Sequence, residues 1–518
     1  MRNISKSVVL FLLMAMSMAT WAELQNVTVG GSVRIRGNYI RNTFTTFQGG
    51  MPMPEQRWSP ASVWKRPIGG RGFFSPVNNV MSIYDWDDRG KDVAFVEQRT
   101  RLHVRADFTQ DVSAFIELDS YDVWGEDFRS DYVTGSDARA RSVDDVEFFQ
   151  AYIEADQIYG VPLRLRIGRQ ELAFGSQWLV GPRDFAFFFT GASFDALRLT
   201  YAHDQFTIDA WASKLAENFA DMFENDVDFY GIYGSFIGLE GFTFDGYLLY
   251  LRDDIPIPNA PFGLAGYSDT NLFTVGLRGA MNKWNFDVDA EVAYQFGSAD
   301  AVGATFTTLL GGDSRANFDN WGAKLDVGYS FDYKCRPRLF AGFRYYGGED
   351  RRDISFWDWI NPFHRPRASI SFNRLFSNDI ASGFMDLNND ASNMWWVRAG
   401  FNTFLYDKFL IIFFASHYEA VEPFRRPLSA KLWGNRVPLL PGASWITKEN
   451  PRDLGYDIGL FTEYHYSEDL IFELGYTHHF VGPGQEYGTF SRWNGLAYNG
   501  GTGKDGGDYI YAGTRIKF

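Results

Sequence analysis

The chain has 518 residues, 18% of them aromatic, and a formal net charge of −15. Its mean hydropathy is slightly negative, at −0.24, and this acidic balance argues against nucleic acid as a partner. Cys335 is the single cysteine, which excludes an intramolecular disulfide as well as structural zinc and c-type haem motifs. We therefore expect no cofactor and no structural metal.

Residues 1–22 are predicted to be a secretory signal peptide. Arg2 and Lys6 precede an apolar stretch from Val8 to Met18, and Ala22 ends a segment suited to cleavage. An uncleaved anchor helix is the alternative, but the stretch is shorter than the roughly 20 residues that a spanning helix needs. The mature chain is thus expected to begin at Glu23 and to be exported.

The mature chain alternates between apolar and polar residues with a period of two, which indicates β-strands exposed to different surroundings on their two faces. In the first segment, Val27 and Val29 alternate with Thr28, and Ile35 alternates with Arg34. We count about eighteen such segments, near residues 27–40, 94–108, 112–121, 147–156, 162–170, 193–201, 205–213, 228–238, 241–251, 270–281, 283–297, 319–332, 338–346, 394–404, 407–418, 454–466, 469–480 and 507–518.

The connections between these segments alternate in length. Short turns such as 109–111, 159–161 and 202–204 follow even-numbered segments, and long loops such as 41–93 and 347–393 follow odd-numbered ones. An even number of strands with this alternation is typical of a bacterial outer-membrane barrel. We predict an all-β fold: residues 23–518 form one transmembrane antiparallel up-and-down β-barrel in the Gram-negative outer membrane. It would have short periplasmic turns and long extracellular loops, and would contact outer-membrane lipid and lipopolysaccharide.

The polar faces of the strands supply a candidate pore lining. If they face the lumen, one wall is basic and the opposite wall is acidic, a division that favours anions or sugar acids. In the alternative, Glu117, Asp119 and Glu154 neutralise the arginines as wall salt bridges. The basic residues are Arg34, Arg36, Arg99, Arg101, Arg105, Arg164, Arg166, Arg198 and Arg515, and the acidic ones are Asp287, Asp289 and Glu291.

The block that follows Leu163 carries a family resemblance. Gly168-Arg169-Gln170, then Leu172, Phe174 and Gly175, and later Phe194-Asp195, resemble the alginate-export porins. The resemblance implies an eighteen-stranded barrel with an arginine-rich pore for an anionic uronate polysaccharide. Arg169, Gln170 and Asp195 are therefore candidate solute contacts, although Arg169 paired with Asp195 could instead fix a loop to the barrel wall.

The expected function is an outer-membrane diffusion channel for alginate or related uronate saccharides. A general porin without uronate selectivity is the first alternative, and a barrel-anchored surface-binding protein is the second. A monomer is expected, with periplasmic polysaccharide-handling proteins as partners. An enzyme is not expected, because no GxSxG or HExxH occurs; His478 and His479 near Glu473 are the only local His/acid concentration.

The long loops contain two further candidate sites. Trp58, Trp64, Phe356, Trp357 and Trp359 are candidate sugar-stacking residues, or aromatic residues that pack the loops against themselves. Asp386, Asn388 and Asp390 have the spacing of a calcium loop but lack its glycine and distant Glu.

Overall fold

The computed structural model describes residues 23–41, 92–108, 111–124, 146–182, 189, 191–217, 226–254, 270–299, 316–348, 368–380, 392–422, 451–484 and 506–518, together with short strands between 425 and 449. The predicted signal peptide, the loop aromatic residues and the candidate calcium loop at 386–390 lie outside the described residues.

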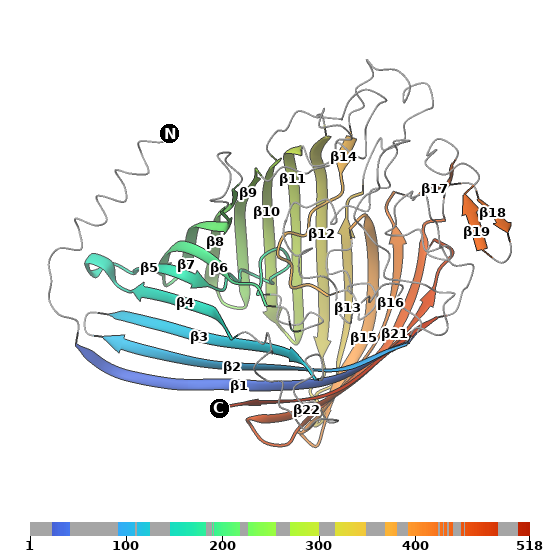
Figure 1. The fold of residues 1–518 in the computed structure, drawn as a ribbon. Helices are drawn as coiled ribbons and strands as arrows, with labels where there is room; N and C mark the ends of the chain where they lie inside the picture. The colour runs from blue at the N-terminus through green and yellow to red at the C-terminus, as the bar shows by residue number, and fades with distance from the viewer. Residues whose placement is uncertain are drawn as a thin grey trace, which may run out of the picture.

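Within these residues, eighteen antiparallel strands form a closed barrel (Figure 1), and β1 pairs with β23 to complete the ring. The strands are β1 (Leu24–Arg41), β2 (Val93–Phe108), β3 (Val112–Val123), β4 (Glu147–Ala155), β5 (Leu163–Gln170), β6 (Phe194–His203), β7 (Phe206–Ala216), β8 (Val227–Leu239), β9 (Phe242–Asp253), β10 (Thr270–Lys283), β11 (Phe286–Ala299), β12 (Ala316–Ser330), β13 (Arg338–Tyr346), β15 (Met394–Leu405), β16 (Phe409–Ala420), β21 (Asp453–His465), β22 (Leu470–Val481) and β23 (Gly507–Lys517).

The eighteen-stranded antiparallel barrel predicted from the alternation is confirmed, with small shifts at the strand ends. No strand end differs by more than three residues, and β11 is one example, since it begins at Phe286 rather than at 283. Trp284 and Asn285 have φ of 54° and 66°, and two successive left-handed residues form the tight turn that matches the twist of a hairpin.

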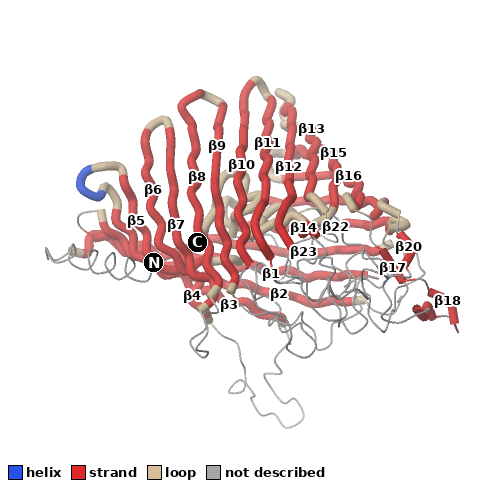
Figure 2. Tube along the Cα trace, turned by 90° about the horizontal axis from the view of Figure 1, so that it is seen from above, coloured by secondary structure: helices blue, strands red, loops and turns tan. Residues whose placement is uncertain are grey.

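Connections differ at the two ends of the barrel. One end, which we call the turn end, has connections of two to seven residues, such as 204–205 and 331–337; the other, the loop end, has connections of ten or more, such as 217–226. Figure 2 shows the turns of β6–β7, β8–β9 and β10–β11 at the turn end. The predicted alternation of connection lengths is therefore confirmed.

Additional short elements lie beside the barrel. β14 (Ala368–Ile370) pairs in parallel with β12 at the loop end. β17 (Arg425–Pro427) pairs with β20 (Thr447–Glu449), and β18 (Ser429–Leu432) pairs with β19 (Asn435–Pro438). None of these was predicted. Across the described ranges, no helix has the length and apolar character that crossing a bilayer requires.

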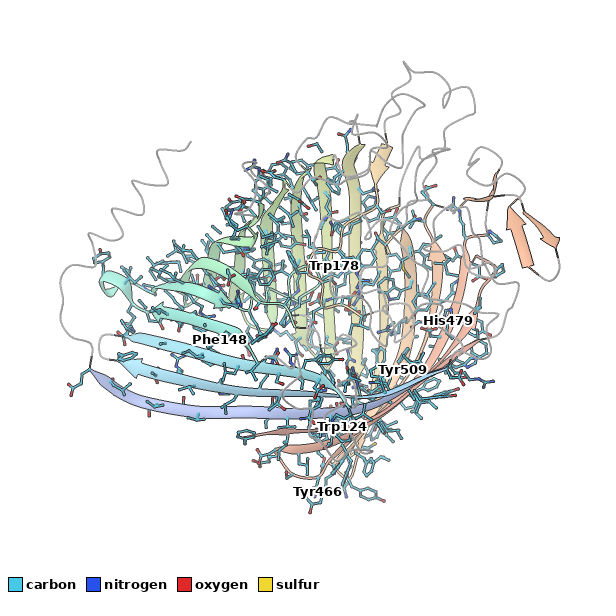
Figure 3. The ribbon with its side chains drawn as sticks, viewed as in Figure 1. Trp124, Phe148, Trp178, Tyr466, His479 and Tyr509 are labelled. Atoms are coloured by element: carbon cyan, nitrogen blue, oxygen red, sulfur yellow. The ribbon has the colours of Figure 1, made fainter. Side chains whose placement is uncertain are left out.

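Contacts between non-adjacent strands identify the inner face of the sheet. Tyr247 on β9 reaches Glu291 on β11, and Arg515 on β23 reaches Glu463 on β21, each across an intervening strand. Such contacts form on the concave side, where side chains converge. Residues of the opposite parity face outward and are mostly apolar and exposed, as is Phe148, which is labelled in Figure 3. The apolar half of the alternation thus covers the lipid-facing surface.

The outer face also shows where the lipid-facing band ends toward the loops. A row of aromatic rings crosses four neighbouring strands, with centroids 5.8, 4.4 and 5.3 Å apart: Tyr230, Tyr250, Phe273 and Phe296. Two residues closer to the loop end, one register row carries alternating charges: Arg169, Asp195, Lys214, Asp228 and Arg252. An aromatic girdle below a charged row is typical of the interface between hydrocarbon and headgroups.

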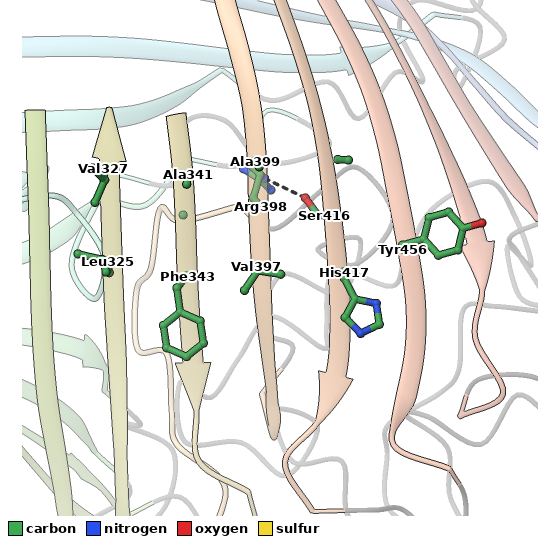
Figure 4. A pocket seen from close by; sticks show the side chains of 12 residues that line it. Leu325, Val327, Ala341, Phe343, Val397, Arg398, Ala399, Ser416, His417 and Tyr456 are labelled. Atoms are coloured by element: carbon green, nitrogen blue, oxygen red, sulfur yellow. Dashed lines mark hydrogen bonds between the residues drawn. The ribbon is translucent and has the colours of Figure 1, made fainter. Parts of the chain in front are cut away.

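Small side chains leave a groove elsewhere on this outer face. Ala341, Ala399 and Ala415 line an apolar groove of about 530 Å³, and Phe343 and Tyr456 stand beside them (Figure 4). Because its walls are continuous with the exposed apolar band, the groove belongs to the lipid-facing surface.

Candidate functional site

Two chain segments fold into the lumen and pair with each other. The first, 171–182, follows β5, and the second, 371–380, follows β14. The Phe376 amide donates to Leu179 O at 2.9 Å, and the Asn378 amide donates to Gln177 O at 2.9 Å. The two inward segments, as we call them, are thus joined by backbone hydrogen bonds.

Aromatic side chains seat the inward segments against the barrel wall. Phe174 lies between Trp211 and Tyr233, with ring centroids 4.5 and 5.1 Å away. Trp178, labelled inside the barrel in Figure 3, is 1% exposed and donates from its indole N–H to Tyr346 Oη at 2.8 Å. Much of the apolar core of this protein therefore lies inside the barrel.

Two residues of the block that resembles the alginate-export porins, Gln170 and Gly175, hold the first inward segment in this position. Gly175 has φ of 53°, and a Cβ at that position would lie 2.2 Å from Tyr233 Oη, so only glycine fits. Gln170 is fully buried and donates to Ala196 O at 3.0 Å. The prediction that Gln170 contacts solute is wrong, because its amide fixes the exit from β5.

Polar side chains on the wall fix the second inward segment. The Gln295 amide donates to Asn373 O and accepts from Asn373 N, both at 2.7 Å. Arg344 contacts Asp379 at 2.8 Å. Glu291 accepts from Ser176 at 2.9 Å and from Tyr247 at 2.8 Å, and is 6% exposed. Glu291 was predicted to line the pore, but it lies beneath the first inward segment.

The connection between β5 and β6 also reaches the other side of the barrel. The ring of Phe189 lies 4.5 Å from the guanidinium carbons of Arg34 and Arg36 on β1. The described parts of this connection thus contact both sides of the barrel: Phe174 and Trp178 contact β7, β8 and β13, and Phe189 contacts β1. The connection narrows a barrel that is too wide to be filled by strand side chains alone.

The predicted basic residues on β1, β2, β5, β6 and β23 face the lumen, with the exception of Arg169. Every one of these lumen-facing arginines contacts a carboxylate, as expected if acidic residues of the wall neutralise the arginines through salt bridges. The pairs are Arg34–Glu473 at 3.4 Å, Arg36–Glu97 at 2.8 Å, Arg99–Asp119 at 2.6 Å, Arg101–Asp119 at 3.4 Å, Arg105–Asp107 at 2.8 Å, Arg164–Asp156 at 2.6 Å, Arg166–Glu154 at 2.5 Å, Arg198–Asp209 at 2.8 Å and Arg515–Glu463 at 3.0 Å.

The predicted acidic wall is likewise mixed in charge. Asp287 pairs with Arg338, and Asp289 pairs with Arg278 and Lys324. The prediction of one basic and one acidic wall is therefore wrong as a statement of net charge. The sequence analysis named Glu117, Asp119 and Glu154 as possible acidic partners, but it did not identify Arg278 and Arg338 as basic partners of the acidic residues.

The two walls nevertheless differ in which partner is exposed. Arg105 and Arg164 are 39% and 46% exposed, whereas Glu154 beneath them is 3% exposed. On the opposite wall, Asp326 is 36% exposed and Arg344 is 9% exposed. Arg99 departs from this trend, at 7% against 12% for Asp119. In most of these pairs, arginine is therefore the more exposed partner on one wall and the carboxylate is the more exposed partner on the other.

Arg169 and Asp195 lie outside the pore. On β5 and β6 they share the outward face with Ile167 and Leu199, and they pair through two hydrogen bonds of 2.8 and 3.0 Å. The prediction that Arg169 and Asp195 contact the solute is therefore wrong. The pair joins neighbouring strands on the outer face, which is closer to the structural alternative.

Three lumen-facing arginines were not predicted, because the polar residues of their strands, β10 and β13, were not assigned to the lumen. Arg278, Arg338 and Arg344 follow the ordinary alternation and could have been found by extending it. Asp379 lies in a segment without periodicity, and no local signal marks it.

The histidine concentration does not assemble. His478 faces outward and contacts Asp508 at 2.7 Å, whereas His479 faces inward, fully buried, and contacts Asp457. Glu473 pairs with Arg34 instead. In the part of the chain that the structure describes, no three His, Cys, Asp or Glu side chains are arranged to hold a metal ion.

Comparison with known proteins finds one matching family and several solved structures that are similar. A family model described as alginate export matches residues 86–395, while no curated protein matches the chain significantly. Among solved structures, the chain resembles the outer-membrane protein OpdK from Pseudomonas aeruginosa, with 9% identity over 95% of this chain and 98% of that one, at a TM-score of 0.48. OprD from the same organism has 7% identity over 95% and 94%, at a TM-score of 0.47. An anion-selective porin from Comamonas acidovorans has 9% identity over 95% and 99%, at a TM-score of 0.40.

The family match covers more than half of the 518 residues, so the protein belongs to the alginate export family and is a β-barrel channel of the outer membrane.

Proposed function

We propose that the channel passes polar, anionic saccharides, namely alginate or related uronate poly- or oligosaccharides. The observation that carries the proposal is that most arginines on the wall formed by β1–β6, β22 and β23 are more exposed than the carboxylates they contact, for example Arg105 at 39% against Asp107 at 34% and Arg164 at 46% against Asp156 at 32%. We assign solute contact to the exposed members of the predicted set: Arg34, Arg105, Arg164, Arg166, Arg198 and Arg515.

The strand register supports this assignment. Arg34 is opposite Arg99 on β2 and opposite Arg515 on β23, so three arginines share one row. Like charges placed opposite each other destabilise a sheet, and the internal carboxylates Glu473 and Glu463 offset that repulsion. A sugar carboxylate can share these guanidinium groups because each has five donors. Weak binding at several such positions allows a solute to enter and to leave again.

The mature domain 23–518, the monomeric state and the periplasmic polysaccharide-handling partners belong to the same proposal. A polymer needs a partner that delivers or removes it at the turn end. On the outer face, the charged row above the aromatic girdle fits lipopolysaccharide headgroups.

Planar bilayers test the proposal. We expect stepwise conductance that trigalacturonate blocks at lower concentration than the neutral maltotriose does. The double variant Arg105→Gln/Arg164→Gln should reduce that difference. Equal block by the two sugars would favour the general porin, and insertion without conductance would favour the surface-binding protein.

A further inference from the structure

One lumen-facing arginine differs from all the others. Thirteen arginines on the described barrel strands face inward, and twelve of them have a carboxylate within 4 Å. Arg398 on β15 is the thirteenth: its hydrogen bonds go to Ser416 Oγ at 3.1 Å and to Ile380 O at 3.3 Å. Neither acceptor carries a negative charge, so among the described residues no carboxylate pairs with Arg398.

The surroundings of Arg398 hold its guanidinium in place. Its Cζ lies 4.8 Å from the centroid of the Phe414 ring, and Figure 4 shows its hydrogen bond to Ser416 on the neighbouring strand. In register, Arg398 lies between Gly342 and Ser416, two small residues. An arginine that is oriented by a ring and flanked by small side chains loses little entropy when it binds a planar anion.

Carboxylates do occur in the same register row, but each is bound to another group. Asp326, opposite Gly342, contacts Arg344 at 2.8 Å and Lys324 at 3.5 Å. Asp457, opposite Ser416, accepts from Tyr418 at 3.1 Å and contacts His479. Neither lies within ion-pair distance of Arg398.

Ser416 orients the guanidinium of Arg398. Its Oγ accepts from Arg398 Nε at 3.1 Å, and the residue is 3% exposed. The remaining guanidinium donors of Arg398 are therefore the groups that a solute carboxylate would meet.

We propose that Arg398 and Ser416 form the principal carboxylate-binding subsite of the channel. This rests on the proposed function, since it assigns the uronate carboxylate a specific place in the lumen. At every paired arginine, a solute carboxylate must displace or share an internal one. At Arg398 no carboxylate of the described residues has to be displaced, and a charge-assisted hydrogen bond to a solute carboxylate is of the stronger kind.

The test compares Arg398→Gln with a matched control, Arg338→Gln. Arg338 also faces the lumen and lies 5.6 Å from an aromatic ring, that of Phe340, but it is paired with Asp287 and is not among the proposed solute contacts. Both variants remove one lumen charge. Block by trigalacturonate is measured in about 1 M KCl, where a Debye length of about 3 Å suppresses distant charges. Heat-modifiable gel migration verifies that each barrel has folded.

We expect Arg398→Gln to raise the half-blocking concentration by about tenfold or more, as for the loss of a hydrogen bond to a charged group. Arg338→Gln should change the half-blocking concentration by less than about threefold under the same screening. Equal effects of the two variants, or an unchanged block in Arg398→Gln, would overturn the subsite while leaving the proposed function in place. If trigalacturonate does not block the unmodified channel, the proposed function fails, and the subsite fails with it.

Discussion

Arg344 on β13 donates from Nε and Nη2 to the two carboxylate oxygens of Asp379, at 2.8 and 2.9 Å. Both side chains are largely buried, at 9% and 14% exposed. Asp379 belongs to the inward segment 371–380, whereas Arg344 also contacts Asp326 on the wall at 2.8 Å. This bidentate pair therefore joins the inward segment to the barrel.

Asp379→Asn should loosen the inward segment without unfolding the barrel. Removing one partner of a buried pair costs up to about 3–5 kcal/mol, and less here because Arg344 keeps its contact with Asp326. The strand ladders of the barrel do not involve Asp379. We expect a larger and noisier single-channel conductance, and faster proteolysis of the segment. Asp407→Asn is the control, because its pair with Arg336 is 67% and 63% exposed. A conductance that stays unchanged in Asp379→Asn would show that this pair does not hold the segment.

The Arg344–Asp379 pair also predicts how the conductance depends on pH. Burial raises the pKa of Asp379, but the Arg344 and Arg374 guanidinium groups lower it further than burial raises it, so the folded pKa lies below the ordinary value. A carboxylate with a depressed pKa contributes stability above its unfolded pKa, about 3.9, and loses it as pH falls through the folded pKa. Conductance should therefore hold constant from about pH 7 to pH 4 and rise only below that range. Asp379→Asn should lack this transition; a transition near pH 6 in the unmodified channel would contradict the assignment.

Much of the barrel could be predicted from sequence because alternation is a local signal. Whether a strand residue faces lipid or lumen depends on its parity, and parity can be read without knowing the partner strand. Arg164 and Arg166 face inward as their parity predicts. Arg169 has the opposite parity and faces outward, so the information was available even though the motif suggested a solute contact.

The charge pairs could not be predicted in the same way. Arg34 and Glu473 are 439 residues apart and lie on β1 and β22, which are not neighbours in the ring. Their contact depends on the stagger of the strands and on barrel curvature, which alternation does not encode. The inward segment 371–380 has no period, and its docking depends on Gln295 and Arg344, which lie far from it in the sequence.

Gly175→Ala should undock the first inward segment. The added Cβ would lie 2.2 Å from Tyr233 Oη, and φ of 53° is unfavourable for alanine. Gly160→Ala is a matched control, since Gly160 has φ of 73° but nothing within 4 Å of the added Cβ, so it isolates the backbone cost of roughly 1 kcal/mol. We expect a higher conductance only in Gly175→Ala, with partial recovery when Tyr233→Phe removes the hydroxyl. Equal behaviour of the two alanine variants would assign the effect to the backbone rather than to the clash.

Arg169→Gln should leave ion selectivity unchanged, because Arg169 and Asp195 face outward at the loop end. The two side chains are 44% and 54% exposed. Exposed ion pairs contribute about 0–1 kcal/mol to the free energy of unfolding, so the midpoint of thermal unfolding should change only slightly. Arg166→Gln provides the comparison on the same strand. Arg166 faces the lumen and contacts Glu154 at 2.5 Å, so its loss removes one positive charge from the lumen wall and should shift the reversal potential toward cations. If both variants shifted the reversal potential equally, Arg169 would have to reach the lumen, and the outward placement of the Arg169–Asp195 pair would be wrong.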